Sequence, residues 1–331
     1  MSLTLTMDNF QERYIDPVMA RIANEVDATG MALYVDVYNF VGVPNAVPST
    51  RLTYLNGGVK LDNTATPRRG KMARNAVIGS QMQATLVDAQ AGLFQKSNLI
   101  AEQYESGEMG TGLGFDFSMD QNTKAHTIGA LGGTPLVNAG SQVGSSIITD
   151  GWTASITGVL KEGDIITLGA AGSTAVNGIV PNTATKTGGG VSTGQLQQFV
   201  VTADVDSDGS GNATIPIDPP IITTGAFQTV TQSAPDNAVI LIFGSATAYA
   251  ALTIKNGLLF NKIAFTRVMV DLPVPGGVDM GGRIRDRDSG LAFRLVRAYD
   301  IRGNSRPTRV EALWGWSTIY PEWACRVVSS E

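Results

Sequence analysis

The acidic stretch Asp204-Val205-Asp206-Ser207-Asp208-Gly209 is the part of the sequence closest to a metal-binding pattern. Carboxylates at alternate positions open the calcium loop of an EF-hand, where they converge on the cation. Such a loop requires a bidentate glutamate at its twelfth position, and Ile215 stands there. We therefore interpret the stretch as the tip of an acidic β-hairpin. Calcium binding by Asp204, Asp206 and Asp208 is kept as the weaker alternative.

A second charged stretch, residues 283–288, alternates arginine with other residues and ends in aspartates. If this stretch is extended, Arg283, Arg285 and Arg287 share one face of a strand. That face could contact phosphate or an acidic neighbouring subunit, and the alternative is a solvated loop whose charges pair with one another. The aspartates beside the arginines weaken the case for DNA, so subunit contact is the functional interpretation for these arginines and for the acidic turn.

The sequence offers little to catalysis, because it contains one histidine, His126, and one cysteine, Cys325. A single cysteine excludes a disulfide within the chain, and the two counts together remove most catalytic and metal sites. His126 has no nucleophile near it in sequence, so we expect a hydrogen-bonded strand residue. Residues 66–70 lack the P-loop arrangement, residues 110–114 do not open a helix after a strand, and there is no Gly-x-Ser-x-Gly elbow. We expect no cofactor and no enzymatic activity.

Aromatic residues gather near the C-terminus, at Trp314, Trp316, Tyr320 and Trp323. Aromatic side chains at this density can form a ligand platform or an interface anchor. Core packing of a closing sheet is the interpretation we favour.

These residues must be positioned by a mixed set of elements. An apolar residue recurs every fourth position from Phe10 to Val26, which predicts a helix from Asp8 to near Gly30 that packs on something else. The remaining patterns predict helices over 50–62, 99–108, 245–255 and 261–270, a strand followed by a short helix over 75–94, and strands over 31–43, 114–119, 291–299, 309–316 and 323–328.

Between about Gly140 and Thr223 the chain loses helical periodicity and becomes rich in Gly, Ser, Thr, Val and Ile. Short apolar runs separated by turn signals predict strands over 152–159, 164–168, 198–205 and 213–217, as in a small barrel or sandwich. We therefore predict an α+β fold in which residues 1–139 and 224–331 form the main domain and residues 140–223 an inserted all-β domain.

Composition agrees with a globular protein, since 43% of the 331 residues are apolar and 16% are charged. A net charge of −5 argues against a general nucleic-acid binder but allows a protein that surrounds DNA without gripping it. No segment has the length of a membrane span, and the N-terminus lacks the regions of a signal peptide. We expect no membrane contact and synthesis in a cytoplasm.

Several segments resemble, in the same order along the chain, the HK97-type coat proteins of tailed phages. The resemblance is closest to the branch from short-tailed Salmonella phages whose coat carries a β-rich insertion domain. The segments that carry it span nearly the whole chain and are residues 10–17, 114–127, 150–152, 160–164, 194–201, 258–265 and 291–300.

The resemblance implies a spine helix and peripheral domain, a central axial domain and an insertion domain. It also implies a subunit that assembles into the pentamers and hexamers of an icosahedral shell in the virion, enclosing double-stranded DNA, with scaffolding and portal proteins as assembly partners. One loop of the insertion, Gly169–Gly190 or Asp204–Gly211, is expected to contact a neighbour across a local two-fold axis. Family members carry an N-terminal arm and extended loop before the spine helix, and only Met1 to Met7 precede it here. Processing, truncation, a late start of the gene or a different closure of the lattice would each explain that difference.

Two other functions were weighed. A tail or adhesin-type glycan-binding protein would show exposed aromatic residues within 140–223, where only Trp152 and Phe199 occur. A hydrolase of cell-wall polymer would need paired carboxylates in a rigid cleft, and the sequence nominates no such pair.

Overall fold

The computed structural model describes residues 11–68, 73–89, 110–169, 175–181, 188–285 and 290–330. It is a mixed α/β structure dominated by strands. Spatial proximity divides the chain into two compact units: unit 1 is made of residues up to Ala32 and of Phe265–Ser317, and unit 2 of Leu33–Ala264 and Thr318–Glu331. None of the helices in the described ranges has the length and hydropathy needed to cross a bilayer.

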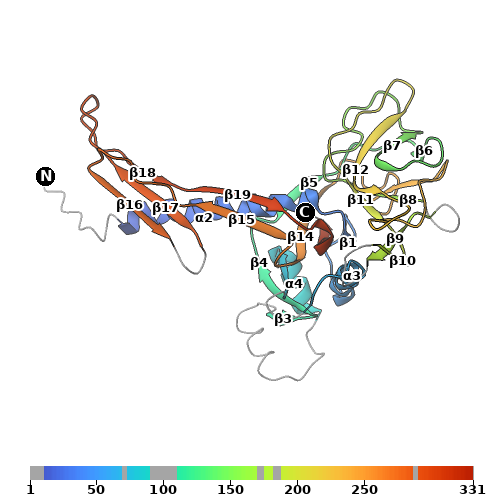
Figure 1. Cartoon of the computed structure of the whole chain (residues 1–331), viewed down its shortest axis with the longest axis horizontal. Coiled ribbons are helices and arrows are strands. Elements are labelled where there is room, and N and C mark those ends of the chain that lie inside the picture. The colour runs from blue at the N-terminus through green and yellow to red at the C-terminus, as the bar shows by residue number, and fades with distance from the viewer. Residues whose placement is uncertain are drawn as a thin grey trace. The chain divides into compact units, whose positions relative to one another are not determined.

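Unit 1 combines the N-terminal helix with strands from the far end of the chain (Figure 1). A π-helical turn, η1 (Gln11–Ile15), leads into α2 (Asp16–Met31). The strands are β15 (Phe265–Val270) paired with β19 (Leu313–Thr318), and the antiparallel sheet β16 (Met280–Arg285), β17 (Ala292–Arg297) and β18 (Thr308–Glu311).

Two tryptophans of β19 form hydrogen bonds to helix α2 of unit 1. The indole nitrogens of Trp314 and Trp316 donate to Thr29 Oγ1 at 3.0 Å and to the Val26 carbonyl at 2.8 Å. Gly30 allows this approach, because a Cβ at that position would lie 2.8 Å from the Trp316 ring. The predicted N-terminal helix is thus confirmed, and so is its packing against another element.

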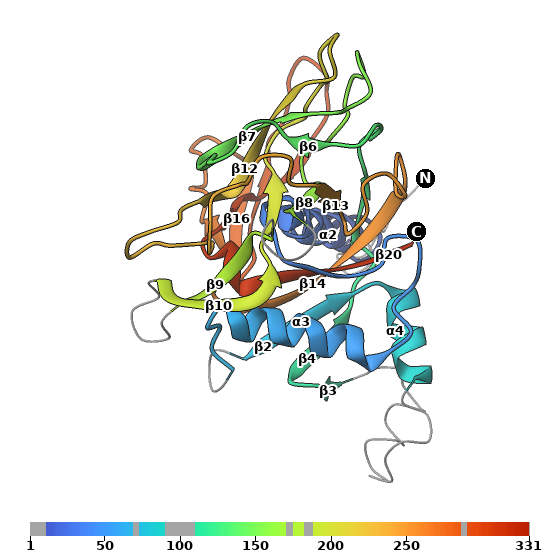
Figure 2. The same cartoon turned by 90° about the vertical axis from the view of Figure 1, so that its right-hand side faces the viewer.

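Unit 2 contains a seven-stranded sheet in the order β1-β20-β14-β2-β4-β3, with β5 also paired to β14. Its strands are β1 (Phe40–Gly42), β2 (Arg74–Ile78), β3 (Thr111–Gly112), β4 (Phe115–Met119), β5 (Lys124–Thr127), β14 (Thr253–Asn261) and β20 (Ala324–Ser330). Helices α3 (Arg51–Asn63) and α4 (Ser80–Asp88) lie along this sheet (Figure 2). Gly57 of α3 leaves room for the Leu259 side chain, which is why this helix sits close to the sheet.

The second sheet of unit 2 has six strands in the order β13-β8-β11-β12-β7-β6. They are β6 (Leu136–Val137), β7 (Gly144–Asp150), β8 (Ile165–Leu168), β11 (Gln198–Val201), β12 (Ala213–Ile221) and β13 (Ile240–Ile242). The hairpin strands β9 (Asn177–Pro181) and β10 (Gly188–Leu196) pair separately, and short 3-10 helices η2 (Ala32–Asp36) and η5 (Pro321–Trp323) complete the unit. The boundaries proposed at residues 140 and 223 stay a prediction.

Three secondary-structure predictions are wrong, and a fourth, the strand over 31–43, is right only for β1 (Phe40–Gly42). Residues 31–43 begin as the 3-10 helix η2 rather than a strand, and residues 152–159 form turns in which Ser155 and Gly158 have positive φ angles. The helices predicted over 245–255 and 261–270 give way to turns and to strands β14 and β15. Pairing explains the error at the end of 245–255, since β14 is hydrogen-bonded to β2, β5 and β20 in the middle of a sheet. The helix predicted over 99–108 lies outside the described residues.

Candidate functional site

The carboxylates of the acidic stretch serve separate turns. Asp204 Oδ1 accepts the backbone N–H of Glu162 at 2.8 Å, and Asp206 Oδ1 accepts that of Gly158 at 2.6 Å. Asp208 closes its own turn, accepting the N–H groups of Asn212 and Ser210 at 2.8 Å each. Those bonds lower the pKa of Asp208 below its usual value.

A calcium site would require these oxygens to converge. Within the described ranges, no three side chains of His, Cys, Asp or Glu are grouped so that they could hold a metal ion. The arrangement fits the acidic-tip interpretation, in which hydrogen bonds to turn amides satisfy the aspartates.

The arginine stretch is extended, as one of its two interpretations required. Arg283 and Arg285 lie on the exposed strand β16, two residues apart and so on one face, while Arg287 is outside the described residues. Arg285 Nη1 lies 3.4 Å from Asp271 Oδ2, and the Arg285 side chain is 59% exposed. Arg283 stands opposite Arg294 of β17 in the sheet register. The subunit-contact role of these residues and of the acidic turn stays a prediction.

His126 belongs to a buried polar network in unit 2. Its Nε2 lies 2.9 Å from Asp164 Oδ1, and its Nδ1 lies 3.3 Å from the Tyr34 hydroxyl. Asp164 Oδ2 also accepts the N–H groups of Gly129 at 3.1 Å and Lys161 at 2.8 Å. His126 is 5% exposed and Asp164 is fully buried, so this pair stabilises the interior. The expectation of a hydrogen-bonded strand residue is confirmed.

Arg326 is the member of this network that sequence reasoning missed. It is fully buried in β20, and its Nε and Nη1 donate to the carbonyls of Val37 and Gly163 at 2.7 Å each. Its guanidinium carbon lies 5.3 Å from the Tyr34 ring centroid. Burial lowers the pKa of Arg326 to about 10, although Tyr34 and Asp164 oppose that shift. The one available signal was an arginine inside the apolar run 323–328.

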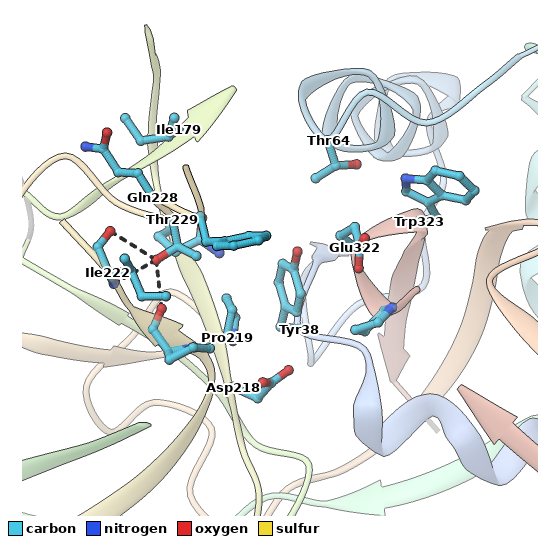
Figure 3. Close-up of a pocket in the computed structure, with 14 residues that line it drawn as sticks. Tyr38, Thr64, Ile179, Asp218, Pro219, Ile222, Gln228, Thr229, Glu322 and Trp323 are labelled. Atoms are coloured by element: carbon cyan, nitrogen blue, oxygen red, sulfur yellow. Dashed lines mark hydrogen bonds between the residues drawn. The ribbon is translucent and has the colours of Figure 1, made fainter. Parts of the chain in front are cut away.

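A pocket in unit 2 brings together residues that no sequence pattern connected (Figure 3). Its volume is about 380 Å³. It is lined by Tyr38, Thr64, Ile179, Gln197, Asp218, Pro219, Pro220, Ile222, Phe227, Gln228, Thr229, Pro321, Glu322 and Trp323.

The polar groups of this pocket perturb one another. Burial raises the pKa of Tyr38 well above its usual value, and the carboxylates of Glu322 and Asp218 add to that rise. Burial and the charge of Asp36 raise the pKa of Asp218. Two carboxylates beside a buried tyrosine make this part of unit 2 more favourable for a cation than for an anion.

The C-terminal aromatics pack internally, as favoured by the sequence. Trp314 and Trp316 bind α2 as described above, and Tyr320 stacks on Trp323 with ring centroids 4.5 Å apart. The two aromatics on which a glycan-binding role depended are also buried, Trp152 at 4% exposure and Phe199 at 0%. Neither can form an exposed sugar platform.

Comparisons with known proteins add little to this geometry. No family model matches the chain. No curated protein matches it either. Among solved structures, the chain is similar to one from Mycobacterium phage Che8, with a TM-score of 0.39 and 10% sequence identity over 97% of this chain and 67% of that one. A TM-score of that size does not establish a shared fold.

Proposed function

We propose that this chain is a major capsid protein of a tailed phage, with an HK97-type fold and an inserted all-β domain. It assembles with copies of itself into an icosahedral shell that encloses double-stranded DNA without sequence-specific contacts. Scaffolding and portal proteins are its partners during assembly, and it is neither an enzyme nor bound to a cofactor. The seven sequence segments that resemble phage coat proteins, in the same order along the chain, support this assignment.

The observation that carries the proposal is the exposed apolar surface of unit 1. Ile301 is 82% exposed, Ile284 68%, Val268 60% and Met280 55%. All six residues of β16 are exposed. Met280 and Ile284 share one face of β16, and exposed apolar side chains that share a face are typical of a surface that a partner covers. A shell subunit has copies of itself as that partner.

The make-up of unit 1 supports the same assignment. The resemblance gives the peripheral domain a long spine helix and a sheet, and unit 1 joins α2 to strands from Phe265–Ser317. In the sequence, the first segment of unit 2, which includes the six-stranded sheet, lies between the two segments of unit 1. This arrangement suits an assembly protein, because unit 1 can present contacts to neighbouring copies while unit 2 supplies the buried core.

Electron microscopy and size-exclusion chromatography with light scattering test the proposal. We expect shells, hexamers, pentamers or sheets from the purified protein, and Ile284→Asp should shift the population toward monomer. Since Ile284 is already exposed, that substitution should leave monomer stability within about 0.5 kcal/mol.

The matched control is Ile148→Asp, which places the same charge on a 52% exposed isoleucine of unit 2. We expect it to disturb assembly less than Ile284→Asp. A protein that stays monomeric at all concentrations and binds a glycan tightly would refute the capsid assignment. Equal loss of assembly in both variants would remove the special role given to unit 1.

A further inference from the structure

The pocket of Figure 3 has an apolar wall facing carboxylates. Pro219, Pro220 and Phe227 form part of its lining, and Phe227 is 75% exposed at the protein surface. Asp218 and Glu322 supply the carboxylates, and the described residues that line the pocket include no lysine, arginine or histidine. This pairing of an apolar wall with negative charge fits a ligand that has an aliphatic stem and a cationic end.

Tyr38 gives independent support for a ligand. Its side chain is 7% exposed and lines the pocket, with its hydroxyl at the end of the ring that faces Glu322 rather than Asp218 (Figure 3). Among the described residues, no hydrogen bond reaches its hydroxyl group. Its oxygen is not one of the fully buried polar atoms that lack a partner in the described part of the chain, so it faces the open pocket, where a ligand can reach it. An ammonium or guanidinium N–H would satisfy the oxygen, and the ring face would attract the same cation.

The surroundings keep this region negative. A neighbouring groove of about 280 Å³ shares Asp218 and Pro321 with the pocket and adds Asp36 and Glu162. Lys60 is the opposing charge, in a cavity of about 40 Å³ that shares Tyr38 with the pocket. Burial lowers the pKa of Lys60, so its positive charge is disfavoured where it lies.

We propose that this pocket is a binding site for an amine or guanidine carried on an aliphatic stem. The cationic end is held by Asp218 and Glu322 and donates to the Tyr38 hydroxyl, and the stem lies against Phe227 and Pro219. Two kinds of ligand carry a cationic end on an aliphatic stem: a free polyamine, and a lysine or arginine side chain of a polypeptide. A metal ion fits less well, because it would not fill about 380 Å³ and gains nothing from proline and phenylalanine walls.

Binding is tested on the full chain with three probes: spermidine, N-acetylarginine methylamide and the neutral N-acetylnorleucine methylamide. Calorimetry or ligand-observed NMR gives each Kd. We expect both cations to bind and the neutral probe to bind at least about tenfold more weakly. Tighter binding of spermidine assigns the site to free polyamines, and tighter binding of the arginine probe assigns it to peptide side chains.

Two variants separate the site from general charge effects. Asp218→Asn should weaken cation binding about tenfold, and Tyr38→Phe about threefold. The matched control Asp150→Asn removes one charge from a partly buried strand residue outside the pocket, and it should leave Kd unchanged. The proposal is overturned if neutral and cationic probes bind alike, if neither cation binds up to about 10 mM, or if the two aspartate variants lose affinity equally.

Discussion

Two arginines, Arg326 in unit 2 and Arg285 in unit 1, have opposite environments. In unit 2, Arg326 is fully buried and its guanidinium binds the carbonyls of Val37 and Gly163. In unit 1, Arg285 is 59% exposed and only approaches Asp271, at 3.4 Å. A buried guanidinium depends on acceptors within the protein, and Arg326 has them at Nε and Nη1 but not at Nη2 among the described residues. An exposed guanidinium is hydrated and contributes little to stability.

Apolar residues follow the same division. Unit 2 contains two buried clusters, one around the six-stranded sheet and one between the seven-stranded sheet and its helices. Among the described residues of unit 1, the buried apolar side chains are Val26, Ala28, Met31 and Ala292. The difference teaches that unit 2 is stabilised by its own buried clusters, whereas the described part of unit 1 buries few apolar side chains.

Replacing the buried arginine should give the largest effect. Arg326→Met keeps a long side chain but removes both hydrogen bonds, leaving two buried carbonyls unsatisfied and Asp164 without its neighbouring cation. We expect the free energy of unfolding to fall by about 3–5 kcal/mol. Arg285→Met, the same change in unit 1, should cost less than about 0.5 kcal/mol. Urea unfolding followed by circular dichroism measures both. Similar losses in the two variants would contradict the contrast between the units.

The single cysteine offers a second comparison, within one sample. Cys325 is fully buried, and burial raises the pKa of its thiol to about 12. Ser305→Cys adds an exposed thiol to unit 1. With 5,5′-dithiobis(2-nitrobenzoate), Cys325 should react at least about 100-fold more slowly than the new thiol, because it reacts only after opening of unit 2. Both thiols should react at one rate in denaturant. Two equally fast thiols in the native protein would show that unit 2 opens freely.

Local patterns were sufficient for part of the fold. The helix ending at Met31 follows from apolar spacing, and the expectation that His126 is a hydrogen-bonded strand residue is confirmed. Residues 253–261 were beyond such reasoning, because their strand is decided by pairing with β2, β5 and β20. A short apolar run has no period that separates helix from strand when its neighbours are unknown.

The candidate sites were less predictable, because their members are distant in the chain. Asp164 meets His126 across 38 residues. Tyr38, Asp218 and Glu322 come from three segments that only the folded unit 2 brings together. Each of these residues is ordinary in its local context, so nothing in the sequence marked the pocket before the strands were placed.

Asp218 differs from Arg326, because its charge has no partner of opposite sign among the described residues. Replacing it should give the smallest change in the free energy of unfolding. It is a partly buried carboxylate that no cation pairs with among the described residues, and burial followed by the charge of Asp36 raises its pKa. The folded protein therefore binds this proton more tightly than the unfolded chain does. Asp218 thus lowers stability at neutral pH, and the penalty disappears as the pH falls through the raised pKa toward about 3.9. Asp218→Asn should raise the free energy of unfolding at pH 7 by less than about 1 kcal/mol, because solvent screens a half-exposed group. Urea midpoints of both proteins at pH 7 and below about pH 4 measure the difference, which should vanish at the lower pH. A loss of stability at pH 7 would mean that a cation already balances this carboxylate.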